Sequence, residues 1–439
     1  MQDNPIPENL RSDHLFLLIG TNPLPNWVAA RLLLRDGGRL YLVHSPETKP
    51  HAERLMVSLG LNEGHVERVP IAEADEQGIY TKVSGQLAKL KGSAVGLHYT
   101  GGTKMMSVHA HRAMRESGLQ PVPVLSYLDA RTLRMKFDGR DPEGFRVALA
   151  PRVGITLDTL LRLHEDYSSG TIPEYEPKCE AAAKALADVH SNYSGQRAWR
   201  DWCDEALKSL DNKKIDTDAT VYRRTVQQLD QLILPTDSKF RSYMSRPDSM
   251  ILNYYSSFLR LIDPVGGTTL QTLARHYKFK DSLHIARWLH GLWLEHHTLA
   301  QIKTCANKAH LTPDGVGMNL NPKNQEEREF EADVLVLRGY QLFYFSCYSG
   351  SDYKTAKLKL FEAIIRATQL GGDEALIALV SCVDNNKIGD FKNVDDLRRE
   401  VEANWQVTGR IQVFGRQDLS RLAGKLENWF NHHGYMVRR

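Results

Sequence analysis

A short run of small, hydroxyl-bearing and basic residues has the composition of an anion-binding turn. Thr100, Gly101, Gly102, Thr103 and Lys104 stand between an apolar run that predicts a strand and a segment that predicts a helix. Glycines allow close backbone approach to a ligand, hydroxyls and helix N-terminal amides donate hydrogen bonds, and lysine adds positive charge. The run therefore predicts a phosphate-binding site at a strand-to-helix junction.

Two more polar turns follow the first and second predicted strands. One runs over residues 20–25 and contains Thr21 and Asn22, and the other covers residues 45–48. Because parallel α/β sheets bind ligands at the carboxyl ends of their strands, we expect all three turns on one edge of a sheet. None of them matches the Walker A or GxGxxG pattern, which argues against an ATPase or a dehydrogenase.

The elements that must position these turns alternate between strand and helix. Apolar runs at 15–20, 39–45, 93–100 and 121–129 predict strands, and amphipathic stretches at 27–36, at 51–60 and after residue 104 predict helices. This alternation is typical of a Rossmann-like parallel sheet, here over residues 1–150.

The rest of the chain divides into two parts. Residues 151–280 are rich in helix formers and predict a mainly helical connector or insertion. In residues 281–439 the α/β pattern resumes: two strands flank a turn at 338–340, a long helix ends at the pair Gly371-Gly372, and another strand follows. We therefore predict a second, C-terminal α/β domain.

Composition excludes several classes of protein. The 439 residues are enough for two or three domains, and the net charge of +3 allows a polyanionic partner only at a local patch. The five cysteines include no CxxC pair, which argues against a disulfide framework or a zinc ribbon. No long apolar stretch or secretory signal is seen, so we expect a cytoplasmic protein with no membrane partner.

The run HYTGGTKMMSVHAHRAM, residues 98–114, resembles the signature of CARF domains, the Rossmann-like sensors of type III CRISPR antiviral defence. It is most similar to the subgroup fused to a C-terminal PD-(D/E)xK nuclease. The resemblance implies a homodimer that binds a cyclic oligoadenylate, expected to be cyclic tetra-adenylate, across its two-fold axis. It further implies ligand contacts from a set of residues on two loops: Thr100, Gly101, Gly102, Thr103, Lys104, Thr21 and Asn22.

The nuclease subgroup has three further motifs, and this chain matches them in order. Trp293-Leu294-Glu295 resembles its helix motif, Glu331-Ala332-Asp333 its acidic strand, and residues 345–350 its third motif. The resemblance implies a restriction-endonuclease-like fold in which Glu295, Glu331 and Asp333 bind Mg²⁺ or Mn²⁺ for cleavage of DNA or RNA. Glu331 and Asp333 are two apart on a strand and are expected on the same face.

The third motif departs from the subgroup at its chemically important positions. Ser346 and Tyr348 stand where the subgroup has glutamate and lysine. A serine is a weak neutral ligand, and a tyrosine does not replace an ammonium group. Lys359 and Glu362, three apart on the following predicted helix, are candidates to replace the missing groups.

Three hypotheses for function remain open at this point. The first is a metal-dependent nuclease activated by cyclic oligoadenylate, with Asp333, Glu331, Glu295, Lys359 and Glu362 as catalytic residues. The second is a non-catalytic receptor whose nuclease-like domain recruits a partner or dimerises. The third is a ring nuclease that degrades the activator in the N-terminal pocket.

Two histidine pairs are the remaining candidates for chemistry. His109 and His111 are two apart on a predicted helix and point in different directions, so they cannot share a metal ion. His296 and His297 lack the HExxH spacing of a zinc site, and we expect both at the surface.

Overall fold

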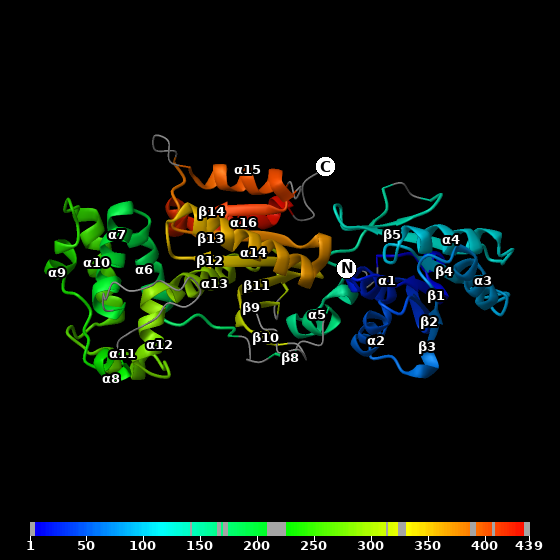
Figure 1. Ribbon diagram of the computed structural model, residues 1–439, viewed down its shortest axis with the longest axis horizontal. Helices are drawn as coiled ribbons and strands as arrows, with labels where there is room; N and C mark the ends of the chain where they lie inside the picture. Colours follow the sequence, from blue (N-terminus) through cyan, green and yellow to red (C-terminus); the bar gives the residue numbers. More distant parts are fainter. Residues whose placement is uncertain are drawn as a thin grey trace.

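The computed structural model describes residues 5–140, 143–164, 168–169, 174–208, 225–312, 315–323, 331–386, 392–405 and 409–433. Three parts follow one another along the long axis of the molecule (Figure 1). The N-terminal unit lies at one end, a bundle of helices from the middle of the sequence lies at the other, and the C-terminal sheet lies between them. Part of the predicted middle segment, residues 209–224, is outside the described residues.

The N-terminal unit is built on a sheet in the order β3-β2-β1-β4-β5-β6-β7. The first five strands in sequence are parallel, and β6 and β7 extend the sheet in antiparallel fashion. The strands are β1 (Ser12–Leu18), β2 (Leu34–His44), β3 (Val66–Pro70), β4 (Val95–His98), β5 (Val124–Asp129), β6 (Arg134–Phe137) and β7 (Phe145–Arg146). Strand order reverses between β1 and β4, and such a switch point is where open α/β sheets bind ligands.

Helices connect these parallel strands. They are α1 (Leu24–Leu33), α2 (Lys49–Ser58), α3 (Glu76–Leu87) and α4 (Lys104–Glu116), with short 3₁₀ turns η1 (Glu8–Leu10), η2 (Glu63–His65) and η3 (Pro151–Val153). The helix expected at 27–36 lies three residues earlier, at Leu24–Leu33, because β2 already begins at Leu34. Strand β3 and helix α3 were not predicted. Two adjacent charged residues, Glu67 and Arg68, interrupt the apolar pattern of β3, which is an edge strand.

The middle of the chain is helical, as predicted. Its elements are α5 (Leu157–His164), α6 (Glu180–His190), α7 (Tyr193–Cys203), the π-helical η4 (Asp204–Lys208), α8 (Val226–Asp230), α9 (Asp237–Ser242), α10 (Ser249–Ile262), α11 (Leu270–His276), α12 (Ser282–Arg287), the π-helical η5 (Trp288–Leu292) and α13 (Trp293–Cys305). Buried aromatic residues fill the bundle, among them Trp199, Trp288 and Trp293. Helix α5 packs instead against α2 and α14.

The C-terminal sheet has the order β14-β13-β12-β11-β9. Its strands are β9 (Val316–Leu320), β11 (Ala332–Arg338), β12 (Gln341–Tyr348), β13 (Leu376–Ser381) and β14 (Ile411–Phe414), and the short strands β8 (Ser168–Ser169) and β10 (Pro322–Lys323) pair separately. Strands β12, β13 and β14 are parallel, whereas β9, β11 and β12 form an antiparallel meander.

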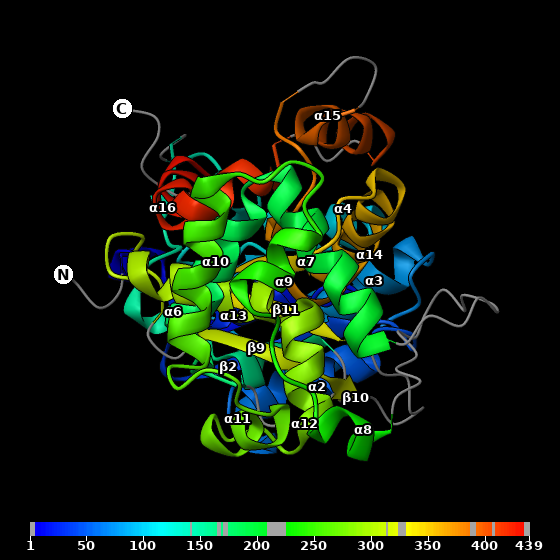
Figure 2. The same cartoon turned by 90° about the vertical axis from the view of Figure 1, so that its left-hand side faces the viewer.

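Helices cover both faces of this sheet. Apolar residues of α14 (Tyr353–Gly371) and α15 (Val394–Trp405) pack on one face, and those of α13 and α16 (Leu422–His433) pack on the other. The 3₁₀ turns η6 (Gly372–Glu374) and η7 (Arg416–Arg421) follow α14 and β14. Seen from the bundle end, the helices of the middle segment lie in front of β9 and β11 (Figure 2).

One apolar core joins the N-terminal unit to the C-terminal sheet. Leu32 of α1, Leu163 of α5, Leu337 of β11 and Leu370 of α14 belong to the same cluster of buried residues. At Gly339, in the β11–β12 turn, an added Cβ would lie 1.6 Å from the carbonyl oxygen of Ala148. Because close-packed interiors transmit displacement, a shift in one unit is passed on to the other.

The predicted fold class is confirmed: a Rossmann-like N-terminal unit, a helical middle and a second α/β unit. Within the described part of the chain, no helix combines the length and the apolar character needed to cross a bilayer.

Candidate functional site

The loops after β1 and β4 touch at the switch point of the first sheet. A Cβ atom at Gly101 would lie 2.2 Å from the carbonyl oxygen of Leu18, and one at Gly20 would lie 2.8 Å from the amide nitrogen of Gly102. Gly102 also has a φ of 74°, which side chains disfavour. This packing explains why the turn needs its glycines. We call the carboxyl ends of β1, β2, β4 and β5 the ligand edge.

Thr103 and Lys104 form the start of α4 at this edge. The Thr103 hydroxyl accepts a hydrogen bond from the amide of Met106 at 3.2 Å and so acts as the N-cap. Lys104 is the first residue of the helix and is exposed. Free helix N-terminal amides and a lysine ammonium together favour an anion. The geometry is thus compatible with the predicted phosphate contacts.

Thr100 contributes in a different way from its neighbours. Its Oγ1 accepts a hydrogen bond from the amide of Leu128 at 2.7 Å and ties the turn to β5. Beside it the rings of Tyr99 and Tyr127 stack with centroids 5.9 Å apart, and Tyr127 is 38% exposed. Sequence reasoning missed Tyr127, because nothing local distinguishes it from a packing tyrosine. An exposed ring beside a phosphate-binding turn can stack a nucleobase.

The loop after β1 places its two predicted ligand residues differently. Thr21 is exposed, whereas Asn22 is partly buried and hydrogen-bonded within the protein. The Asn22 Oδ1 accepts from the amide of Leu24 at 3.0 Å and lies 3.1 Å from Nε2 of His164. Its Nδ2 donates to Oε2 of Glu374 at 3.5 Å. Asn22 therefore reaches from the ligand edge to the C-terminal unit.

The third polar turn is held by its own side chains. The Ser45 hydroxyl donates to Oε1 of Glu73 at 2.9 Å, and the Ser45 amide donates to Oγ1 of Thr48 at 3.0 Å. These bonds tie the end of β2 to the loop after β3. The turn lies on the ligand edge, as its place after a parallel strand predicts.

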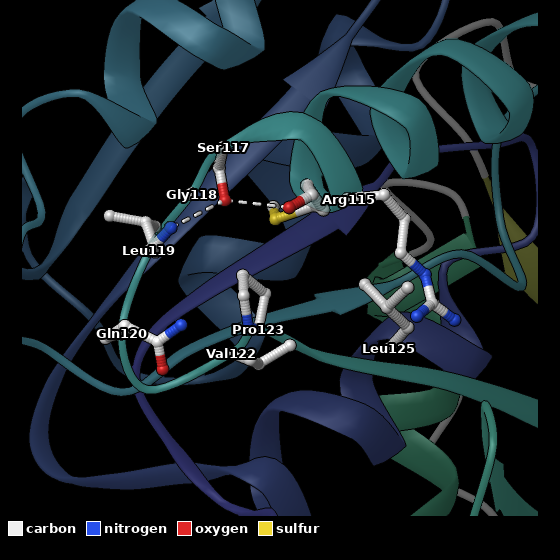
Figure 3. A pocket seen from close by; sticks show the side chains of 9 residues that line it. Arg115, Ser117, Gly118, Leu119, Gln120, Val122, Pro123 and Leu125 are labelled. Carbon is white, nitrogen blue, oxygen red and sulfur yellow. Dashed lines mark hydrogen bonds between the residues drawn. The ribbon is translucent and has the colours of Figure 1, made fainter.

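A small cavity lies at the other end of α4 (Figure 3). It has a volume of about 180 Å³ and is lined by residues between Met114 and Leu125, including Ser117 and Gln120. The Ser117 hydroxyl accepts from the amide of Leu119 at 3.3 Å and donates to the carbonyl of Met114 at 2.7 Å. None of the predicted ligand residues lines it.

Asp333 occupies the start of β11, opposite the end of β12. Its Oδ2 accepts hydrogen bonds from the amide of Cys347 at 2.6 Å and from the hydroxyl of Ser346 at 3.3 Å. Burial raises the pKa of Asp333 to about 6, against the opposing effects of the Cys347 amide and of Lys359. We call this end of the second sheet the acidic edge.

Glu295 of α13 lies within electrostatic reach of Asp333. It is only 7% exposed, and burial together with the charges of Asp333 and Glu331 raises its pKa well above the ordinary value. Glu331 itself is exposed. Like-charged carboxylates in a buried place favour either a shared proton or a bound cation.

Lys359 is the cation that the structure brings to these carboxylates. Its charge lowers the pKa of both Glu295 and Asp333. Its Nζ lies 4.0 Å from Oε2 of Glu362, one turn further along α14. Glu362 acts electrostatically on Tyr344, which the charges of Asp333 and Glu331 also affect. Glu295, Asp333 and Lys359 thus interact through their charges at this end of the sheet, whereas Glu331 is exposed and Glu362 is linked to them through Lys359 and Tyr344.

The carboxylates of the acidic edge suit a hard divalent cation, but their side chains do not converge tightly. Carboxylate oxygens are the ligands that Mg²⁺ and Mn²⁺ prefer, and the buried Glu295 supplies one close to Asp333. Within the described ranges, however, no three histidine, cysteine, aspartate or glutamate side chains form a group that could hold a metal ion. The Ser346 hydroxyl, which donates to Asp333, stands where the subgroup has a charged ligand.

The histidine pairs have structural roles. The prediction that His296 and His297 lie at the surface is wrong, because they are 5% and 1% exposed. The Nδ1 of His296 accepts from the amide of Lys178 at 2.9 Å, and Nε2 of His297 lies 2.9 Å from the carbonyl oxygen of Leu419. Helix α13 is buried on nearly all sides, so its sequence lacks the polar face that marks exposed positions.

His109 and His111 point apart, as their spacing predicts. The Nε2 of His109 lies 3.7 Å from Oε2 of Glu76, and that of His111 lies 2.7 Å from Oδ2 of Asp138. They therefore bind different carboxylates.

Comparison with known proteins identifies the fold. No family model matches the chain, and no curated protein matches it in sequence. Among solved structures, Can2 from Sulfobacillus thermosulfidooxidans, in complex with cyclic tetra-adenylate, is 12% identical with a TM-score of 0.61, covering 96% of this chain and 98% of its own. Protein VC1899 from Vibrio cholerae is 14% identical with a TM-score of 0.61, covering 96% and 99%. The chain therefore shares its whole architecture, from end to end, with these two proteins.

Proposed function

We propose that this protein is a cyclic-oligoadenylate-dependent effector of type III CRISPR antiviral defence. The observation that carries the proposal is the contact of the Gly20 and Gly101-Gly102 loops at the switch point, directly before the N-terminus of α4. Lys104 and the free amides of α4 supply positive charge for phosphates. Can2, which shares the fold at low identity, is known in complex with cyclic tetra-adenylate, and we propose the same ligand class here.

The activator binds between two copies of the chain in this proposal. A ring of like nucleotides has rotational symmetry, and a closed two-fold dimer is the commonest assembly that matches it. The two ligand edges face one another, so that Lys104 of each copy approaches phosphates of the same ring. Binding then favours one arrangement of the dimer over the other, which is the requirement for activation.

The acidic edge cleaves nucleic acid in the same proposal. Glu295, Glu331 and Asp333 would have to draw closer together to hold a divalent cation, which would supply activation of the attacking water and stabilisation of the charge on phosphorus. The Cys347 amide and the Ser346 hydroxyl fix the orientation of the Asp333 carboxylate. Lys359 acts as the cation that the third motif lacks, with Glu362 orienting its ammonium.

The non-catalytic receptor is the second candidate, and two observations favour it. Ser346 is a neutral partner of Asp333 instead of a third carboxylate. The Tyr348 ring folds against Gly350, where an added Cβ would lie 2.2 Å from the phenol oxygen. A phenol turned in this way supplies no positive charge to a reacting phosphate.

The sensor half of the proposal is tested by binding. We expect wild-type protein to bind cyclic tetra-adenylate in calorimetry, and Lys104→Ala to lose about 1.5–3 kcal/mol of binding free energy, the contribution of a charge-assisted hydrogen bond. Lys91→Ala, an exposed lysine in the loop before β4, is the matched control and binds normally. Equal affinity in folded Lys104→Ala would show that the turn is not part of the binding site. If wild-type protein does not bind, the proposed sensor function is wrong.

The nuclease half is tested by cleavage. Purified protein is incubated with Mn²⁺ and cyclic tetra-adenylate, with plasmid DNA or single-stranded RNA as substrate. We expect slow, activator-dependent cleavage that favours Mn²⁺, because a site with one ligand fewer binds metal weakly. Asp333→Ala abolishes it. If wild type and Asp333→Ala are equally inert with both substrates, the receptor is the correct function.

A further inference from the structure

A cavity of about 410 Å³ lies between the ligand edge and the C-terminal unit. Thr21, Asn22 and His51 line it from the N-terminal unit, and Thr368, Gln369 and Asp373 line it from the end of α14 and from η6. Its volume is within the range of about 300–1,000 Å³ that is usual for small-molecule sites. It begins at the same loop, after β1, that meets the Gly101-Gly102 turn. It therefore adjoins the proposed activator site.

The wall of this cavity is tied together by contacts between the two units. Asn22 is held from both units, by His164 at 3.1 Å and by Glu374 at 3.5 Å. Gly372, with a φ of 64°, lets the two units meet, since a Cβ there would lie 1.9 Å from Nδ2 of Asn22. His164 and Glu374 are 5% and 3% exposed, so their ends of the two contacts are buried. A wall made in this way presents the same groups to each ligand that enters.

The chemistry of the lining fits an uncharged nucleoside part and not a phosphate. Asp373 brings an exposed carboxylate, whose Oδ1 lies 3.6 Å from Nη1 of Arg410, and Thr21, Thr368 and Gln369 bring hydroxyls and an amide. The carboxylate can accept from an adenine amino group or a ribose hydroxyl, and it repels a phosphate placed directly against it, although Arg410 offsets part of that repulsion. Lys104, beside which the phosphates are expected, lies on the N-terminal unit's side of the cavity. Its position agrees with a site in which the nucleoside enters the cavity and the phosphates stay at the turn.

We propose that this cavity is a nucleoside subsite of the cyclic-oligoadenylate site, through which the activator contacts α14 and η6 directly. The proposal rests on the proposed sensor function and adds a second wall to its site. One adenosine of the ring enters the cavity while its phosphates remain at the α4 N-terminus. The activator then bridges the N-terminal unit and the C-terminal unit of one chain.

Helix α14 gives this contact a consequence at the acidic edge. Its 19 residues run without interruption from Tyr353 to Gly371 and span about 28 Å. Thr368 and Gln369 lie near its C-terminal end, and Lys359 lies nine residues before Thr368, about 14 Å along the helix, within electrostatic reach of Glu295 and Asp333. A rigid helix that moves at one end moves at the other. Occupation of the cavity thus adjusts the position of the Lys359 ammonium relative to the two carboxylates.

The test compares variants at the α14 side of the cavity by calorimetry with cyclic tetra-adenylate. We expect the double variant Thr368→Val/Gln369→Ala to bind about tenfold more weakly, the effect of losing one or two neutral hydrogen bonds. Gln86→Ala, which removes a similar side chain at the far end of α3, binds like wild type. Unchanged affinity in the double variant, with normal loss in Lys104→Ala, would overturn this inference and leave the sensor function standing.

The variant Asp373→Ala distinguishes a nucleoside from a phosphate in the cavity, because the two occupants predict opposite changes in affinity for the ring. If a nucleoside donates to Asp373, the variant binds the ring more weakly. If a phosphate occupies the cavity, removal of the carboxylate strengthens binding, and the inference is wrong. Titration with AMP tests whether a free nucleotide binds in the cavity. We expect that AMP does not compete with cyclic tetra-adenylate for binding. AMP binding that persists in Lys104→Ala and is lost in Asp373→Ala would mean an independent nucleotide site instead of a subsite.

Discussion

The buried carboxyl of Glu374 makes the contact between the two units sensitive to pH. Its side chain is 3% exposed, and burial raises its pKa from 4.5 to about 7, with Asp373 adding to the rise and with its own backbone amide, Arg410 and Asn22 opposing it. Because the folded-state pKa is above the unfolded one, the ionised form is the one that folding disfavours. Burial of the Glu374 carboxyl therefore does not lower the free energy of unfolding below pH 4.5. It lowers that free energy more and more as pH rises toward 7.

The size of the effect follows from the two pKa values. A difference of about 2.5 units at 1.36 kcal/mol each is about 3 kcal/mol of unfolding free energy, lost between pH 4.5 and 7 and constant above that. Glu374→Gln removes the titration but keeps an oxygen that accepts from Nδ2 of Asn22. We expect the variant to match wild type near pH 4.5 and to be more stable by up to about 3 kcal/mol at pH 8.

The assay is urea unfolding followed by tryptophan fluorescence, at intervals from pH 4.5 to 8.5, for both proteins. Asp373→Asn is the control. Asp373 is 82% exposed, and its charge adds to the rise in the pKa of Glu374, so the titration of Glu374 should persist in this variant at a lower pH. Parallel curves for wild type and Glu374→Gln across this range would refute the argument, since Glu374 would then titrate in the folded protein as it does in the unfolded chain.

Two other predictions concern the ligand edge. Light scattering and calorimetry should give one ring bound per two chains, and a protein that stays monomeric with and without activator would contradict the two-fold site. Tyr127→Ala should cost about 1–3 kcal/mol of ring affinity if an adenine stacks on the exposed ring, while Tyr127→Phe keeps the π-face and binds like wild type. Equal affinity in Tyr127→Ala would mean that the ring only packs against Tyr99.

Local features of the ligand edge could be predicted from sequence because local geometry creates them. The glycines of the TGGTK turn are required by contacts within the turn and with the end of β1, and Thr103 caps the helix that it precedes. Apolar runs were enough to predict the inner strands β2, β1, β4 and β5 of the first sheet and β13, β12 and β11 of the second, but not β3, β6, β7, β9 and β14. The helix expected to reach residue 36 ended earlier, since β1 pairs with Leu34 and pairing between strands outweighs local helix preference.

Features that depend on distant residues could not be predicted. Asn22 was expected to face the ligand, but its amide bridges to Glu374, some 350 residues away in sequence, and to His164. His296 and His297 look like surface residues only while the partners of α13 are unknown. Lys359 was a candidate only by its place on the predicted helix, and its reach to Glu295 and Asp333 depends on how α14 lies across the sheet.

The arrangement of the three parts limits how the two proposed sites can communicate. The acidic edge faces the helical bundle, where Nε2 of Gln196 donates to the carbonyl of Ser349 at 3.4 Å, and the ligand edge faces the opposite end of the second sheet. Because the two edges lie at opposite ends of the second sheet, a signal between them must pass through packed elements. Helix α14 joins both ends and is anchored in the core shared by the two units. Because its flank also holds Lys359, a change in its position alters the charge balance of Glu295 and Asp333 without any rearrangement of the strands that carry the site.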